Sequence, residues 1–435
     1  MLACARAVQA VHAGKSLSDA LTATPTHLRA AVQAITFHVM RRLGLATEIK
    51  NVLVRRTPPN ALFDALLQVS IALLDTALEA ARPNDAAAER GAHVPVYTVH
   101  TVVDQAVRAA SNTPGMQPYK GLLNAALRRY TRERDDILTQ VLRKPVARWN
   151  YPLWWVKQLQ QAYPAQWESL LTAGDQPGPM TLRVNLRRTS VDALLQRFAQ
   201  EGIQAERLGG AGLVLAQARP VHDIVGFDQG WWSVQDAAAQ QAAALLEPFD
   251  GARVLDACSA PGGKTAHLLE MAQVELLALD SDAGRLERVG HNLDRLGLRQ
   301  SNVQLVCADA AELQAWWDGR PFDLVLADVP CTASGVVRRH PDIRWLRREA
   351  DIDGTAALQQ QIIAALWRTV KPGGRLLYAT CSIFPQEGER QAQRFLSSHA
   401  DAQRLPAPGQ ILPLPDEGGR ALYDGFFYAL FAKHA

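Results

Sequence analysis

Two cysteines in the C-terminal half of the chain have neighbours that favour a chemical role. Cys331 lies in the sequence Asp-Val-Pro-Cys and Cys381 in the sequence Ala-Thr-Cys-Ser, each directly after an apolar run that is typical of a buried strand. In an open α/β sheet, ligands bind at the carboxyl ends of the strands. Two thiols and the carboxylate of Asp328 at neighbouring strand ends would suit covalent attack on an electrophilic ring. The alternative is that both cysteines are small core residues, which is the commoner role of an isolated cysteine.

A glycine-containing turn follows an earlier predicted strand. Its residues are Cys258, Ser259, Ala260, Pro261, Gly262, Gly263 and Lys264. Glycines at a strand-to-helix turn let the backbone approach a ligand, and the helix that follows presents free N–H groups. The turn lacks the GxGxxG pattern of dinucleotide-binding folds, and it has Cys258 where a P-loop has its first glycine. A methionine-derived nucleoside cofactor, which needs no phosphate cradle, fits the turn best.

Three acidic residues close three successive predicted strands. They are Asp280, Asp309 and Asp328. Strand interiors disfavour aspartate, and any one of the three could instead cap a helix. The first is placed to accept both hydroxyls of a ribose, and the second could accept a hydrogen bond from an adenine amino group. Together they support a nucleoside site.

The pattern of elements predicts a multidomain chain. Residues 1–140 have apolar residues at three- and four-residue spacing, which predicts an all-α bundle. Residues 141–232 contain a linker and a small α/β module. From residue 233 to residue 435, strands alternate with helices, which predicts a parallel, doubly wound sheet. The strands are expected at 253–257, 274–279, 303–307, 322–327 and 375–379, with a last antiparallel pair near 426–432.

Basic charge is concentrated in the predicted bundle. Residues 1–150 contain 19 Lys and Arg against 11 Asp and Glu, whereas the rest of the chain contains 27 against 32. The last helix of the bundle carries Arg128, Arg129 and Arg132, and arginines repeated along an exposed helix suit a phosphate backbone. A second basic run, residues 338–348, follows Cys331. We expect Arg338, Arg339 and Arg344 in this run to contact a polyanionic substrate.

Taken together, these motifs resemble the RNA cytosine-5 methyltransferase family along the whole chain. The resemblance rests on DACSAPGGKT, ALDSD, ADVPC, RRHPDIRW and KPGGRLLYATCS, and the helical region is similar to NusB-like RNA-binding domains. It implies a NusB-like bundle, a small α/β middle module and a Rossmann-like class I methyltransferase domain. The family usually has Asp-Ala-Pro-Cys-Ser-Gly-Thr-Gly around the first cysteine. Here Ala333 stands in the place of a family glycine, so we expect this loop to be less mobile.

The resemblance also implies roles. Cys381 would be the nucleophile that adds to C6 of cytosine, Cys331 would assist product release, and Asp328 would orient the base and stabilise charge. S-adenosylmethionine would lie along residues 258–264, with Asp280 at its ribose and Asp309 near its adenine. Asp328 would also belong to the cofactor-binding residues. The substrate would be cytidine 967 of 16S ribosomal RNA, either free or within an assembling small subunit.

Composition narrows the remaining possibilities. The five cysteines form no CxxC pair, so we expect no metal site and no disulfide framework. Neither a signal peptide nor a segment long enough to span a membrane is expected, so we predict a cytoplasmic protein without a membrane partner, acting as a monomer. Two other functions remain open from the residues alone, a non-enzymatic RNA-binding or antitermination factor and a P-loop NTPase.

Overall fold

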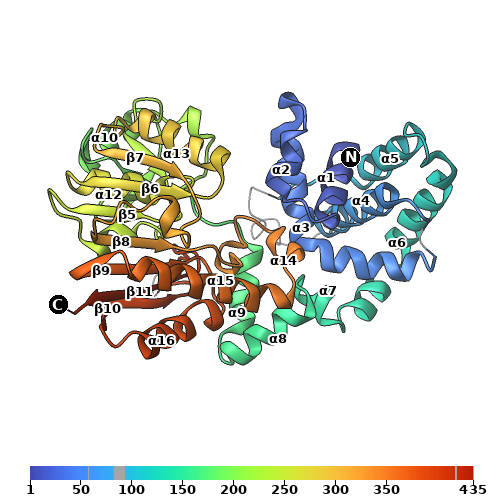
Figure 1. Cartoon of the computed structure of the whole chain (residues 1–435). Helices are drawn as coiled ribbons and strands as arrows, with labels where there is room; N and C mark the ends of the chain where they lie inside the picture. The colour runs from blue at the N-terminus through green and yellow to red at the C-terminus, as the bar shows by residue number, and fades with distance from the viewer. Residues whose placement is uncertain (57, 83–93, 417–418, 435) are drawn as a thin grey trace. The chain divides into compact units, whose positions relative to one another are not determined.

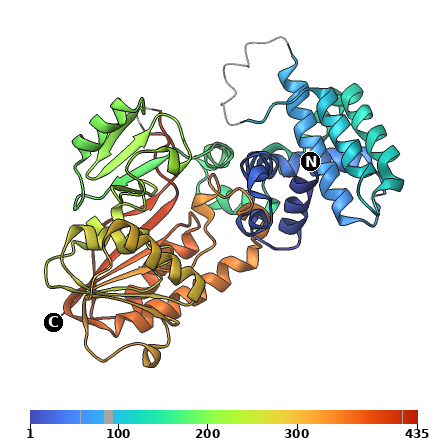
Figure 2. The same cartoon turned by 90° about the horizontal axis from the view of Figure 1, so that it is seen from above.

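The computed structural model describes residues 1–56, 58–82, 94–416 and 419–434. The chain divides into two compact units, which are drawn in Figures 1 and 2. One unit comprises Met1–Asp175 together with Arg339–Glu349, and the other comprises Gln176–Arg338 and Ala350–Ala435. The sequence did not predict that a short segment of the C-terminal half belongs with the N-terminal unit. The division into three domains at residues 140 and 232 stays a prediction.

The N-terminal unit is helical, as the spacing of its apolar residues predicts. Its helices are α1 (Leu2–His12), α2 (Leu17–Thr22), α3 (Thr26–Leu53), α4 (Ala61–Ala80), α5 (Val99–Ser111), α6 (Lys120–Val141), α7 (Pro145–Trp149), α8 (Leu153–Ala162), α9 (Trp167–Asp175) and α14 (Ile343–Leu346). Helix α4 packs against α1, α3, α5 and α6. It begins after Asn60, whose side chain accepts a hydrogen bond from the N–H of Phe63 and so caps the helix.

Helix α4 is long and apolar enough to cross a membrane by length and composition, contrary to the expectation that no segment is. However, 78% of its most apolar window is buried within the protein. A helix that is apolar on all sides is expected at the centre of a bundle, where every face meets another helix. Its composition is therefore explained by its position in the core.

A small antiparallel sheet begins the second unit. Its strands are β1 (Thr181–Val184), β2 (Ala205–Gly209), β3 (Gly212–Leu215) and β4 (Trp232–Val234), in the order β2-β3-β1-β4. Helix α10 (Val191–Gln200) packs its apolar residues Val191, Leu194 and Phe198 against this sheet. A helix packed on a short sheet agrees with the small α/β module that the sequence predicts within residues 141–232.

A seven-stranded sheet forms the centre of the second unit (Figure 1). Its strands are β5 (Arg253–Asp256), β6 (Glu275–Asp280), β7 (Val303–Cys307), β8 (Phe322–Asp328), β9 (Val370–Thr380), β10 (Ala402–Ile411) and β11 (Phe426–Lys433). Their order is β10-β11-β9-β8-β5-β6-β7; β5 to β9 are parallel, and β10 and β11 are antiparallel. The prediction of a largely parallel sheet with a final antiparallel pair is confirmed.

Helices cover both faces of this sheet. Successive side chains of a strand point to opposite faces, so Leu324 and Leu326 of β8 join one core and Val325 joins the other. The first core is completed by α11 (Gln241–Leu246), α12 (Gly263–Met271) and α13 (Ala283–Leu296), and the second by α15 (Glu349–Trp367) and α16 (Glu389–Ser398). This three-layer arrangement is the Rossmann-like fold predicted from the alternation of strands and helices.

Candidate active site

The carboxyl ends of four parallel strands define the site. From β5 the strand order reverses, because β6 and β7 lie on one side of it and β8 and β9 on the other. Such a reversal opens a crevice between the loops that leave the two central strands, and ligands of open α/β sheets bind there. The glycine-containing turn leaves β5, Asp328 ends β8, and Cys381 follows β9. The sequence therefore brings its candidate residues to one edge.

The two cysteines face each other directly. The Sγ atoms of Cys331 and Cys381 are 3.4 Å apart, and both side chains are half-buried. The hydrogen bond with Cys381, together with burial, raises the pKa of the Cys331 thiol. Cys331 is therefore held as a neutral thiol near neutral pH. The proximity of the two side chains confirms that they end neighbouring strands, and their chemical roles stay predictions.

An ion pair joins the turn after β5 to the end of β8. The Nζ atom of Lys264 lies 2.6 Å from Oδ2 of Asp328 and 5.2 Å from the ring centre of Phe426. Burial alone would lower the pKa of Lys264, but the charge and the hydrogen bond of Asp328 raise it, and the proximity of Cys381 acts in the same direction. A permanent cation thus stands beside the thiol pair. In a P-loop the lysine reaches phosphates, whereas here the ammonium is bound by Asp328.

The turn itself needs its glycine. Gly262 has a φ of +95°, a conformation that costs little only for glycine, and a Cβ at this position would lie 3.0 Å from Cγ1 of Val289. The N–H of Ser259 donates to the carbonyl of Leu279 in the neighbouring strand, and the buried Oγ of Ser259 has no protein partner among the described residues. A tight turn with an unpaired buried hydroxyl is suited to approach a polar ligand closely.

The three strand-end carboxylates differ in their surroundings. Asp280 is 3% exposed; its Oδ2 accepts from the N–H of Ala260 at 3.1 Å and its Oδ1 from that of Asp282 at 3.0 Å. Each oxygen has a second lone pair for a further donor. Asp309 is exposed, and its Oδ1 accepts from the N–H of Ala311 at 2.8 Å. Asp280 is thus fixed beside the turn, while Asp309 stays a predicted cofactor ligand.

Sequence reasoning missed a fourth carboxylate, Asp256, the last residue of β5. It is 1% exposed, and its Oδ2 accepts from Oγ1 of Thr265 at 2.6 Å. Burial raises its pKa to about 7, and the nearby charges of Asp328 and Asp280 act in the same direction. The first residue of the DACSAPGGKT run was visible in the sequence, but nothing there indicated its burial next to two other carboxylates.

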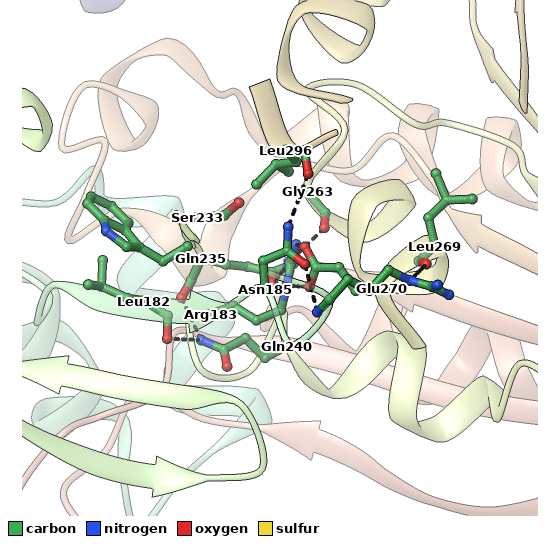
Figure 3. Close-up of polar contacts among 12 residues, drawn as sticks. Leu182, Arg183, Asn185, Ser233, Gln235, Gln240, Gly263, Leu269, Glu270 and Leu296 are labelled. Atoms are coloured by element: carbon green, nitrogen blue, oxygen red, sulfur yellow. Dashed lines mark hydrogen bonds and ion pairs between the residues drawn. The ribbon is translucent and has the colours of Figure 1, made fainter. Parts of the chain in front are cut away.

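A buried arginine holds the start of α12 from the small sheet (Figure 3). Arg183 of β1 is fully buried and binds the carboxylate of Glu270 in α12 through two hydrogen bonds of 2.8 Å. It also donates to the carbonyl of Gly263 at 2.8 Å and to the side chain of Gln235. The small sheet is thereby attached to the turn that the sequence assigned to a cofactor.

The loop after Cys331 shows how the chain accommodates the missing family glycine. Ala333 has a φ of +58°, a left-handed conformation in which glycine would be less strained. Gly335 remains, and a Cβ there would lie 2.1 Å from the carbonyl oxygen of Gly425. The N–H of Gly335 donates to the carbonyl of Cys381 at 2.9 Å. The loop therefore keeps the glycine that close packing requires and accepts local strain at Ala333.

Comparison with known proteins identifies the family. A model of "16S rRNA methyltransferase RsmB/F" matches residues 243–432, and a model of the RsmF/B-like ferredoxin-like domain matches residues 151–222. Ribosomal RNA small subunit methyltransferase B of Vibrio cholerae is 40% identical over 98% of this chain and 95% of its own length. The chain belongs to the RsmB/F methyltransferase family. It is an S-adenosylmethionine-dependent rRNA methyltransferase.

Solved structures agree with this assignment. The crystal structure of PH0851 covers 100% of this chain with a TM-score of 0.76 and 25% sequence identity, and 99% of that protein is covered. A methyltransferase homologue from Pyrococcus horikoshii covers 66% of this chain, with 97% of its own length matched, a TM-score of 0.58 and 28% identity. Because the chain is an rRNA methyltransferase, the two alternative functions, a P-loop NTPase and a non-enzymatic RNA-binding factor, are excluded.

The residues of the turn fit the cofactor of this family. S-adenosylmethionine carries a ribose with two hydroxyls and a charged amino acid portion. The carboxylate of Asp280 and the unpaired hydroxyl of Ser259 offer polar partners next to the backbone of Gly262. The interactions of individual turn residues with the cofactor stay predictions.

Two of the arginines expected to contact RNA are structural, and the prediction was wrong for them. Arg344 is fully buried, lies 2.5 Å from Asp175 and stacks over the ring of Tyr151 at 3.9 Å. Arg338 is 3% exposed and is paired with Asp424. Neither guanidinium has surface to offer a phosphate. Arg339 is half-buried, and its role stays a prediction.

The arginines of α6 also differ from one another. Arg128 and Arg132 are exposed, whereas Arg129 is partly engaged by Glu133 at 2.8 Å and by the carbonyl of Val52 at 3.3 Å. Within the helical unit, therefore, Arg128 and Arg132 are the members of the predicted set that are best able to reach RNA.

Proposed function

We propose that this protein transfers a methyl group to C5 of a cytidine in 16S rRNA through a covalent bond between Cys381 and C6 of the base. The observation that carries the proposal is the pair of thiols 3.4 Å apart beside the ion pair of Lys264 and Asp328. The relatives of this chain are named for methylation of small-subunit ribosomal RNA, which supports the substrate.

The chemistry requires a nucleophile because C5 of cytosine reacts poorly with electrophiles. When the thiolate of Cys381 adds to C6, the C5–C6 double bond becomes an enamine-like system, and C5 gains the electron density that it needs. S-adenosylmethionine supplies the methyl group as an electrophile. Loss of the C5 proton then restores the double bond and expels the Cys381 thiolate. One difficult substitution is thereby divided into an addition and an elimination.

Asp328 and Lys264 would hold the base during addition. The carboxylate of Asp328 is positioned by Lys264 at 2.6 Å, with 26% of its side chain exposed toward solvent. One oxygen can bind the ammonium while the other meets the N3 and N4 edge of the cytosine. A protonated N3 beside the carboxylate would stabilise the charge that develops as the thiolate adds.

Cys331 would act in the elimination. Its thiol is 3.4 Å from the nucleophile, and its pKa is raised by the hydrogen bond with Cys381 and by burial. Once Cys381 is bonded to C6, Cys331 is the neighbouring sulfur that can assist removal of the C5 proton. A raised pKa disfavours Cys331 as the attacking thiolate, which supports this order of roles.

The family resemblance leads us to propose cytidine 967 as the target. The base must leave its stack to reach thiols that lie at the strand ends. The basic helical unit would bind the surrounding RNA, either free or in an assembling small subunit. We further propose that the enzyme acts as a monomer in the cytoplasm, where ribosomal RNA is processed.

The two cysteine roles can be separated by trapping. Cys331→Ala should accumulate a protein–RNA adduct that survives denaturing electrophoresis, because addition proceeds while elimination stalls. Cys381→Ala should form no adduct and should be inactive. Bisulfite sequencing of 16S rRNA methylated by the wild-type enzyme would report the position.

Both variants should bind S-adenosylmethionine as the wild type does. Such binding would show that the cofactor site of each variant is intact. An adduct with Cys381→Ala and none with Cys331→Ala would mean that the roles are reversed. Absence of adduct in both variants, with methylation retained, would contradict the covalent mechanism.

A further inference from the structure

A buried carboxylate lies behind the cysteine pair. Glu387 ends the 3-10 helix η6 (Pro385–Glu387), six residues after Cys381, and is fully buried. Its Oε2 accepts from Oγ1 of Thr332 at 2.5 Å and from Oγ of Ser382 at 2.6 Å. These two donors belong to the residues that directly follow Cys331 and Cys381. One carboxylate oxygen therefore joins the two cysteine loops.

The second oxygen extends the network to α15. Oε1 of Glu387 accepts from the N–H of Thr332 at 2.8 Å, from Oγ1 of Thr355 at 2.7 Å and from Nε2 of Gln359 at 3.1 Å. All five donors are neutral. A carboxylate that accepts several hydrogen bonds is stabilised in its charged form even when it is buried. Its position suits an anchor that fixes both loops against one helix.

Further hydrogen bonds show that the two loops form one unit. Oγ of Ser334 lies 2.9 Å from Oγ of Ser382 and accepts from the N–H of Ile383 at 2.9 Å. The N–H of Gly335 donates to the carbonyl of Cys381. Ser382, the partner of Ser334, also donates a hydrogen bond to Glu387. Loss of the carboxylate would therefore disturb both loops together, and with them the distance between the two thiols.

Charge gives the same residue a second effect. The negative charge of Glu387 raises the pKa of the Cys331 thiol, after the larger contributions of the hydrogen bond with Cys381 and of burial. The groups that face Cys331 are Cys381 directly after β9, Glu387 in η6 and Tyr378 within β9. The Tyr378 hydroxyl donates to the carbonyl of Glu387 and to Gln359, so it is part of the same network.

We propose that Glu387 is a positioning residue of the methyltransferase reaction, which holds the two cysteine loops in register and keeps a negative charge behind Cys331. The assignment rests on the proposed function for its effect on catalysis. The arrangement of the thiols can be tested without RNA. No part of the proposal requires Glu387 to contact the base or the cofactor.

The first experiment measures the thiols directly in the full-length protein. Glu387→Gln has the same shape but no charge. The rate of alkylation of Cys331 and Cys381 by iodoacetamide would be followed against pH, with each site resolved by peptide mass spectrometry. We expect the Cys331 profile of Glu387→Gln to move to lower pH, because the charge that disfavours its thiolate is gone. An unchanged Cys331 profile would overturn the proposal whether or not the covalent mechanism holds.

The second experiment measures catalysis. Glu387→Gln should lower kcat for RNA methylation by about one to two orders of magnitude, because small displacements of reacting groups are costly. KM for RNA and the affinity for S-adenosylmethionine should change little. The matched control is Thr355→Val, which removes a partner of Glu387 on α15 but leaves the donors of both cysteine loops in place; it should keep near-normal kcat.

A merely structural role predicts different results. In that case Glu387→Gln would lose cofactor binding and thermal stability in parallel with kcat, or Thr355→Val would be as impaired as Glu387→Gln. Either result would overturn the proposal. If Glu387→Gln does not fold, Ser382→Ala tests the same link, because it removes one donor between the carboxylate and the Cys381 loop. It should lower kcat without lowering cofactor affinity, and wild-type kcat would contradict the role of the link.

Discussion

At the scale of single residues, the site depends on carboxylates with different degrees of burial. Asp280 accepts backbone N–H groups, Asp328 binds Lys264, and Asp256 lies beneath them with one hydroxyl partner, Thr265. Residues of one type at neighbouring strand ends thus have different hydrogen-bond partners. Asp256, for which the pKa is raised to about 7, changes charge within the physiological range of pH.

Asp256→Asn should reveal this charge in the pH dependence of stability. In the unfolded chain the carboxyl ionises near its ordinary pKa of 3.8, but in the folded protein it stays protonated until about pH 7. Unfolding between these values releases a proton, so the contribution is fully present below about pH 4 and is lost as the pH rises to about 7. Between these pH values the free energy of unfolding falls by up to about 1.4 kcal/mol per pH unit.

The stability of Asp256→Asn relative to wild type should therefore improve as the pH rises from about 4 to about 7, as measured by calorimetric melting at each pH. Asp309→Asn is the matched control, since Asp309 is exposed at a nearby strand end. It should follow the wild type at every pH. A constant difference between Asp256→Asn and wild type would show that Asp256 is ionised in the folded state throughout.

At the scale of elements, the sequence predicted the strands well because alternation and apolar runs are local signals. β7 was placed at its observed bounds, and the predicted ends of β5, β6 and β8 differ by one residue. What the sequence could not show are partners that are distant along the chain. The basic run after Cys331 indicated a surface, yet Arg344 is buried by Asp175, which lies 169 residues away. Glu387 was overlooked for the same reason, because its donors come from three separate segments.

The attachment of β1 to α12 can be tested with Arg183. Arg183→Met should lower the melting temperature, because it leaves the carboxylate of Glu270 buried without its partner, which typically costs about 3–5 kcal/mol. It should also weaken binding of S-adenosylmethionine in calorimetric titration, because the carbonyl of Gly263 loses its donor. The double variant Arg183→Met with Glu270→Met removes both charges.

The double variant should recover most of the stability, since two apolar side chains can replace a buried ion pair. Its cofactor affinity should remain weak, because the donor to Gly263 is still absent. Recovery of stability and cofactor affinity together would mean that Arg183 supports the fold but does not position the turn.

At the scale of the whole molecule, the excess of basic residues in the N-terminal part is divided between two uses. Some arginines form ion pairs inside the helical unit. Arg42 and Arg134 bind the buried carboxylate of Asp75, to which the hydroxyl of Tyr130 also donates at 2.6 Å. Others, such as Arg128 and Arg132 of α6, are exposed. Composition alone counts both kinds equally, so the charge of the domain overstates the cations available to RNA.

A buried arginine and an exposed one should therefore behave differently when each is replaced. Arg344→Ala should lower the melting temperature, because it removes a fully buried side chain that is paired with Asp175 and stacked on Tyr151. Thermal melting of this variant measures the structural use of basic charge. A melting temperature equal to that of the wild type would mean that the buried pair adds nothing to stability.

Replacing the exposed pair of α6 should instead weaken RNA binding without affecting the fold. Arg128→Ala with Arg132→Ala should lower the affinity for 16S rRNA and reduce the slope of log affinity against log salt by roughly one for each phosphate that is no longer neutralised. Melting temperature and S-adenosylmethionine affinity should stay at wild-type values. The control is Arg6→Ala with Arg108→Ala, which removes the same charge from exposed positions on α1 and α5. Equal salt slopes for wild type and the α6 double variant would show that this face of α6 is ordinary surface.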